Sequence, residues 1–97
     1  MIDDINNKIG IEAEVNFLDF CKDHVVRYSN SRPESEKTIT KDDVYVVWTC
    51  KTLQNNKALL GTTLPDGMYY EITYNGDKKE AYFDAYKKEA NICIPCK

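Results

Sequence analysis

Apolar residues between residues 11 and 28 recur every three or four positions, which is typical of one face of an α-helix. The repeating positions are Ile11, Val15, Leu18, Cys21, Val25 and Tyr28. Phe17 and Phe20 widen this face, so we expect the helix to pack on a broad surface such as a sheet. The polar segment 29–39 contains Pro33 and is expected to be a linker. We interpret residues 1–10 as an arm.

The pattern changes to that of strands in the second half of the chain, at 57–63, 68–74 and 79–87. The first two strands flank Leu64-Pro65-Asp66-Gly67, a turn in which Gly67 accepts a left-handed conformation. The last two flank Asn75-Gly76, which predicts a tight type I′ hairpin with positive φ at both residues. Together they predict an antiparallel meander.

Residues 40–54 are ambiguous. The β-branched and aromatic run Val44 to Thr49 favours a strand. Thr40-x-x-Asp43, however, resembles a helix cap, so a second helix stays open. We therefore predict an α+β fold in which residues 11–97 form one domain, with an N-terminal helix packed on an antiparallel meander of three or four strands. The chain ends in a loose tail that contains Cys93 and Cys96.

Side chains alternate along a strand, so the hairpins decide which residues share a face. The apolar side is expected to face the core and holds Ala58, Leu60, Met68, Tyr70, Ile72, Ala81, Phe83 and Ala85. If segment 44–53 pairs through an Asn55-Asn56 turn, Val44, Val46, Trp48 and Cys50 join the opposite side, with Leu59, Thr63, Tyr69, Glu71, Thr73, Tyr82, Asp84 and Tyr86. Exposed contiguous aromatic residues usually indicate a partner. The candidate binding residues are Trp48, Lys51, Tyr69, Glu71, Tyr82 and Tyr86. Alternatively, a helix over 40–54 buries this surface.

Length and charge narrow the function classes. The chain has 97 residues and a net charge of -3. Residues 1–50 contain ten acidic and six basic residues, and residues 51–97 contain six acidic and seven basic residues. This balance argues against binding to duplex nucleic acid, which rests on clustered Lys and Arg. There is no apolar run of membrane-spanning length, and the start, Met1-Ile2-Asp3-Asp4, does not resemble a secretory signal. We expect a cytoplasmic protein.

No catalytic or cofactor motif is evident. Cys93-Ile94-Pro95-Cys96 is a C-x-x-C pair, but only Lys97 follows it, so it lacks the helix that activates redox pairs. Zinc requires four ligands, and the remaining candidates, Cys21, His24 and Cys50, form no second spaced pair. We therefore expect no enzyme activity, no cofactor and no metal site.

Three stretches carry a family resemblance: DVYVVWTCKTLQNNKALL at 43–60, GMYYEITYNGDKKEAY at 67–82 and DAYKKEAN at 84–91. They resemble an uncharacterised family of small proteins from Firmicutes and their phages, with the Cys93–Cys96 tail outside the resemblance. The resemblance implies a phage or prophage accessory protein in a bacterial cytoplasm. By analogy, such a protein binds and inhibits a host protein, for example as an anti-defence inhibitor of the anti-CRISPR type. Two alternatives stay open: an oligomeric module that binds or sequesters a small ligand such as a nucleotide, and a structural homodimer.

Overall fold

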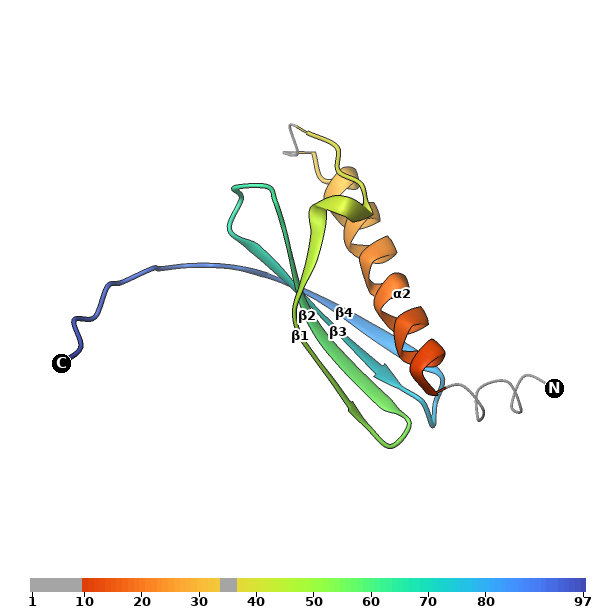
Figure 1. The fold of residues 1–97 in the computed structure, drawn as a ribbon. Helices are drawn as coiled ribbons and strands as arrows, with labels where there is room; N and C mark the ends of the chain where they lie inside the picture. Colours follow the sequence, from red (N-terminus) through yellow and green to blue (C-terminus); the bar gives the residue numbers. More distant parts are fainter. Residues whose placement is uncertain (1–9, 34–36) are drawn as a thin grey trace.

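One helix lies across one face of a four-stranded antiparallel sheet in the computed structural model (Figure 1). The structure describes residues 10–33 and 37–97, with side chains of the helix described from residue 16. The elements are α2 (Gly10–Ser31), the 3-10 turn η1 (Lys41–Asp43), β1 (Val44–Thr52), β2 (Asn55–Thr62), β3 (Met68–Asn75) and β4 (Glu80–Lys87). The strands lie in the sheet in chain order. The predicted α+β fold is confirmed, with four strands; the predicted arm at 1–10 lies outside the described residues except for Gly10.

Helix α2 buries one stripe of side chains at four-residue steps. Phe17, Cys21, Val25 and Ser29 are all buried, because residues four apart lie on the same side of a helix. The predicted stripe is confirmed at Cys21 and Val25. The helix continues three residues beyond the predicted end. Tyr28 is 38% exposed, although its ring lies against those of two sheet residues.

The chain returns from α2 along a segment that is held by one asparagine. The Asn30 side chain donates to the carbonyl oxygen of Ile39 at 3.0 Å and accepts from the Ile39 N–H at 2.9 Å. This pairing satisfies both backbone groups of Ile39, whose side chain is buried in the core. The linker is therefore fixed to the helix immediately before the sheet begins.

The ambiguous segment is a strand preceded by a single helical turn. The N–H of Thr40 donates to Asp43 Oδ2 at 3.0 Å, so the cap-like pattern serves only η1. Strand β1 then joins β2 through Leu53 and Gln54, because Thr52 pairs with Asn55. The predicted Asn55-Asn56 turn is wrong, and Leu53 takes the left-handed conformation with φ of 57°.

A bulge divides β1 into two parts. Val46 pairs with Leu60 and Trp48 pairs with Leu59, so Val47 is the extra residue. Val44 and Val46 therefore face α2, and Val44 is buried in the core. Trp48 and Cys50 face the other side. The prediction that all four lie on the side away from the helix is wrong for the two valines.

The faces of β2, β3 and β4 are as predicted. The core-facing residues of β2 and β3 are each at most 1% exposed: Ala58, Leu60, Tyr70 and Ile72. Phe83 of β4 pairs with Ile72 and lies on the same side, which faces the helix. Gly67 has φ of 72°, which confirms the predicted left-handed turn residue.

The β3–β4 turn differs from the predicted type I′ hairpin. Asn75 pairs with Glu80, which leaves the four residues 76–79 in the loop. Asn75 Oδ1 accepts from the N–H groups of Asp77 and Lys78, and positive φ falls on Lys79 rather than on Gly76. The faces are unchanged, because lengthening the loop by two residues preserves the alternation.

Gly76 is required by a close contact with the β1–β2 turn. A Cβ atom at this position would lie 2.2 Å from the carbonyl oxygen of Gln54. The Gly76 N–H donates to Asn55 Oδ1 at 3.1 Å, and Gln54 Nε2 donates to Asp77 Oδ1 at 2.8 Å. The two hairpin turns are therefore joined at one end of the sheet.

Candidate binding surface

The side of the sheet away from α2 carries aromatic side chains from three strands. We name it the aromatic face, and it consists of Tyr45, Trp48, Leu59, Tyr69, Tyr82 and Tyr86. Tyr45, Trp48, Tyr82 and Tyr86 are between 42% and 54% exposed. The helix occupies the opposite face (Figure 1), and no described element covers this one. Of the two sequence alternatives, the structure shows the exposed surface.

The strand register aligns three of these rings in one row. Tyr45 pairs with Gly61, Gly61 with Tyr69, and Tyr69 with Tyr86. The Tyr45 ring lies over Gly61, since a Cβ atom at residue 61 would be 2.6 Å from it. Absence of a side chain at residue 61 therefore lets Tyr45 lie flat on the sheet beside Tyr69.

Carboxylates alternate with the tyrosines on the β3–β4 half of this face. The hydroxyl of Tyr86 donates to Glu71 Oε1 at 3.4 Å, and that of Tyr82 donates to Glu80. The hydrogen bond and charge of Glu80 raise the pKa of Tyr82, and the charges of Asp84 and Glu71 raise the pKa of Tyr86. Both phenols are therefore neutral donors at neutral pH.

Lys57 of β2 lies on the same side of the sheet. Lys57 Nζ is 3.7 Å from Glu71 Oε2, while within residues 10–33 and 37–97 neither Glu80 nor Asp84 forms an ion pair. Glu71, Glu80 and Asp84 outnumber the two described lysines of this side, Lys57 and Lys88, the second of which follows β4. The β3–β4 half of the aromatic face is therefore acidic.

The structure brings together five of the six predicted binding residues. Trp48, Tyr69, Glu71, Tyr82 and Tyr86 share the aromatic face. Lys51 does not, because it pairs with Asn56, which pairs with the core-side Tyr74. Its predicted place on this surface is wrong.

Sequence reasoning missed Tyr45 and Lys57. Tyr45 reaches the aromatic face only because of the bulge at Val47, for which the sequence carries no glycine or other signal. Lys57 could have been found, since it lies two residues before Leu59, which alternation already placed on this side.

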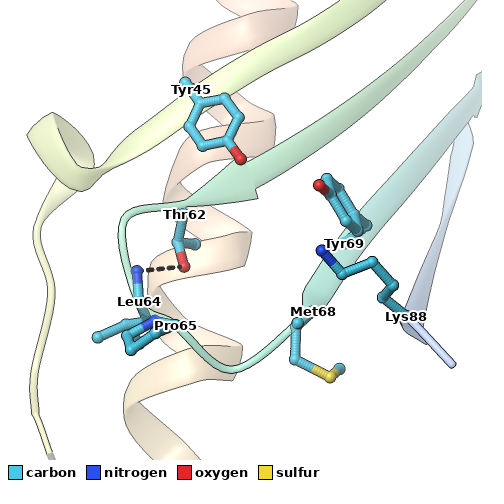
Figure 2. A pocket seen from close by; sticks show the side chains of 8 residues that line it. Tyr45, Thr62, Leu64, Pro65, Met68, Tyr69 and Lys88 are labelled. Atoms are coloured by element: carbon cyan, nitrogen blue, oxygen red, sulfur yellow. Dashed lines mark hydrogen bonds between the residues drawn. The ribbon is translucent and has the colours of Figure 1, made fainter. Parts of the chain in front are cut away.

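An open pocket of about 430 Å³ lies at one end of this face, between the end of β2 and the start of β3. Figure 2 shows the hydroxyls of Tyr45 and Tyr69 and the ammonium group of Lys88 directed toward the same space. The N–H of Lys88 donates to the carbonyl oxygen of Gly67 at 2.7 Å, which fixes the backbone there. Partial burial, followed by the charge and hydrogen bond of Tyr69, raises the pKa of Tyr45.

The cysteines and the histidine do not converge. Within residues 10–33 and 37–97, no three His, Cys, Asp or Glu side chains gather as a metal site. Burial raises the pKa of Cys21 to about 12, which keeps it a protonated core thiol. His24 lies against the Phe20 ring, with the ring centres 4.4 Å apart. Cys50, Cys93 and Cys96 are exposed and free.

These features define a small α+β protein with one helix-covered sheet face and one exposed aromatic face. The chain belongs to a family of unknown function, DUF6275, which matches residues 18–96. The match includes Cys93 and Cys96, which the sequence resemblance left outside. Searches of curated proteins and of solved structures gave no match. Of the helices described, none is both long and apolar enough to cross a membrane.

Proposed function

We propose that this chain is a non-enzymatic binding protein that docks on a basic surface of another protein through its aromatic face. The observation that carries the proposal is the set of exposed rings Tyr45, Trp48, Tyr82 and Tyr86 on one side of the sheet. Tyrosine and tryptophan are enriched in interface cores, where they bury large areas at low cost in conformational entropy.

The charges on this face support a basic protein partner. Arginine side chains stack on tyrosine and tryptophan rings and also form paired hydrogen bonds with carboxylates. Glu80 and Asp84 lie beside Tyr82 and Tyr86, so one arginine could meet a ring and a carboxylate together. The same carboxylates would repel a phosphate backbone.

We place this activity in a bacterial cytoplasm. The sequence resemblance to phage-encoded proteins supports an accessory protein that binds and inhibits a host protein, such as an anti-defence inhibitor of the anti-CRISPR type. The small size and the lack of a catalytic motif support an inhibitor that acts by occupying a surface. This setting rests on analogy and on composition.

The test is affinity capture from bacterial lysate with matched variants. We expect the wild-type chain to enrich one host protein, and Trp48→Ala with Tyr86→Ala to lose it, because the two changes remove one ring from each edge strand of the face, β1 and β4. Leu53→Ala is the control, since Leu53 is 81% exposed but lies in the β1–β2 turn. Loss with Leu53→Ala alone, or retention by the double variant, would contradict the proposal. Capture of nothing above background by the wild type would count against it.

A second candidate function rests on the pocket beside Tyr45, Tyr69 and Lys88. Two phenol rings and one ammonium group suit a small ligand with a planar ring and an anionic group, such as a nucleotide. Thermal-shift measurements with nucleoside monophosphates test this. We expect stabilisation that Lys88→Ala abolishes and Lys51→Ala leaves unchanged; no stabilisation by any nucleotide removes this candidate.

A further inference from the structure

The C-terminal segment after β4 leaves the body of the protein. Residues 88–97 form neither helix nor strand and are all exposed, and Figure 1 shows them running away from the sheet to the C-terminus. Ile92 and Ile94 are 76% and 75% exposed, and the free thiols of Cys93 and Cys96 alternate with them. We name residues 88–97 the C-terminal arm.

The two arm cysteines form half of a known type of metal site. A C-x-x-C pair supplies two thiolates to one ion, and a structural zinc site takes four ligands in a tetrahedron. Sites made only of thiolate sulfur in this geometry favour zinc over magnesium or calcium, which prefer oxygen ligands. One arm therefore leaves two coordination positions of a zinc ion unfilled.

The described part of the same chain does not supply the other two ligands. Cys21 is buried against the sheet. Tyr86, at the end of β4 next to the arm, lies in the same row of the sheet as Tyr45 of β1. Cys50 is five residues further along β1 and therefore lies toward the opposite end of the sheet. At about 3.3 Å per residue, this separation is about 17 Å, and Cys50 together with the arm pair would still supply only three of the four ligands. No described cluster of metal-binding side chains exists elsewhere.

We propose that two copies of this chain bind one Zn²⁺ between their C-terminal arms, with Cys93 and Cys96 of each copy as the four ligands. The four thiols lose their protons on binding, which gives a tetrathiolate site with two excess negative charges. Lys97, next to Cys96 in each copy, partly offsets this charge.

The extended arm makes this arrangement sterically possible. Residues 88–92 separate the first cysteine from the end of β4, which corresponds to about 17 Å of extended chain at about 3.3 Å per residue. Two sheets can therefore lie on opposite sides of the ion without contact. Equal contributions from two identical arms also fit the symmetry of a two-fold dimer. The family match through residue 96 places the arm within the family's domain.

The experiment measures mass and metal content of the full chain under a phosphine reductant. We expect the metal-free chain to have the monomer mass of 11.2 kDa and to double its mass when Zn²⁺ reaches one ion per two chains. EDTA should reverse the change. Co²⁺ in place of Zn²⁺ should give the intense visible absorption of a tetrahedral tetrathiolate.

Matched variants make the test specific. Cys93→Ser and Cys96→Ser should stay monomeric with Zn²⁺, whereas Cys50→Ser, which removes another exposed thiol, should dimerise as the wild type does. Circular dichroism confirms that each variant is folded. The proposal is overturned by an unchanged mass with Zn²⁺, by one zinc bound per monomer, or by a zinc-dependent dimer of the arm variants. A dimer that forms only when the reductant is left out, and that EDTA leaves intact, would assign the arm cysteines to a disulfide instead.

Discussion

Replacement of Gly61 by alanine should destabilise the protein when residue 45 is tyrosine. The same replacement should stabilise the protein when residue 45 is alanine. In the native protein the new Cβ atom would lie 2.6 Å from the Tyr45 ring, so the ring must move. Overpacking costs about 1–3 kcal/mol, and we expect a value near 1 kcal/mol because the contact involves the free end of a side chain. Without the ring the clash disappears. Alanine is then favoured over glycine in a strand by about 0.5–1 kcal/mol.

Urea unfolding of four proteins measures this: wild type, Gly61→Ala, Tyr45→Ala and the double variant. With an m-value of about 1 kcal/mol/M, the midpoint should fall by about 1 M for Gly61→Ala in the native background. It should rise by about 0.5 M for the same change in the Tyr45→Ala background. The coupling between the two sites isolates the ring contact. An equal loss in both backgrounds would refute the reasoning, since the cost would then arise from the backbone of β2.

Three further changes test other parts of the fold. Gly76→Ala should lower the free energy of unfolding by about 1–3 kcal/mol in urea titrations, because its Cβ atom would meet the Gln54 carbonyl oxygen; an unchanged midpoint would contradict the contact between the turns. Asn30→Ala should cost about 2 kcal/mol in the same assay, because both backbone groups of Ile39 lose their partner; a loss below about 0.5 kcal/mol would mean that water replaces the side chain. The pKa of the Cys21 thiol is about 9 in the unfolded chain and about 12 in the folded protein, so between these pH values the folded state binds more protons. The free energy of unfolding should therefore fall as pH rises from about 9 toward about 12. Unfolding at about pH 8 and about pH 11 should show a smaller decrease for Cys21→Val than for the wild type, and equal decreases would contradict burial as the cause.

Much of the fold follows from two periodicities in the sequence. Alternation over 57–87 placed Tyr70, Ile72 and Phe83 on the core side, and it held although the β3–β4 loop has four residues rather than the predicted two. An even change in loop length leaves every side chain on its own face. The aromatic residues of β3 and β4 were therefore predictable, whereas their exact partners were not.

The first strand was less predictable, because its register depends on packing rather than on local signals. The run Val44 to Trp48 is β-branched or aromatic throughout, so nothing in it marks Val47 as the bulge. Burial of Val44 beneath α2 and exposure of Trp48 require the extra residue between them. The face of Tyr45 follows from the same bulge.

The turn after β1 shows a second reason for the difficulty. Asparagine tolerates positive φ well, which favoured Asn55-Asn56 as the turn. In the structure the side chain of Asn55 instead accepts a hydrogen bond from the Gly76 N–H, and Leu53 takes positive φ. A contact between residues 21 positions apart in the chain decides the turn.

The chain order of the sheet has a consequence for how the protein folds. Each strand pairs with its neighbour in sequence, across loops of two, five and four residues. Closure of such short loops loses little entropy, so each hairpin can form before any distant segment arrives. Docking of α2 onto β1 and β2 is then the step with the longest sequence separation. We expect a low contact order and folding that is faster than in β-sandwiches of the same length, where strands distant in sequence must pair first.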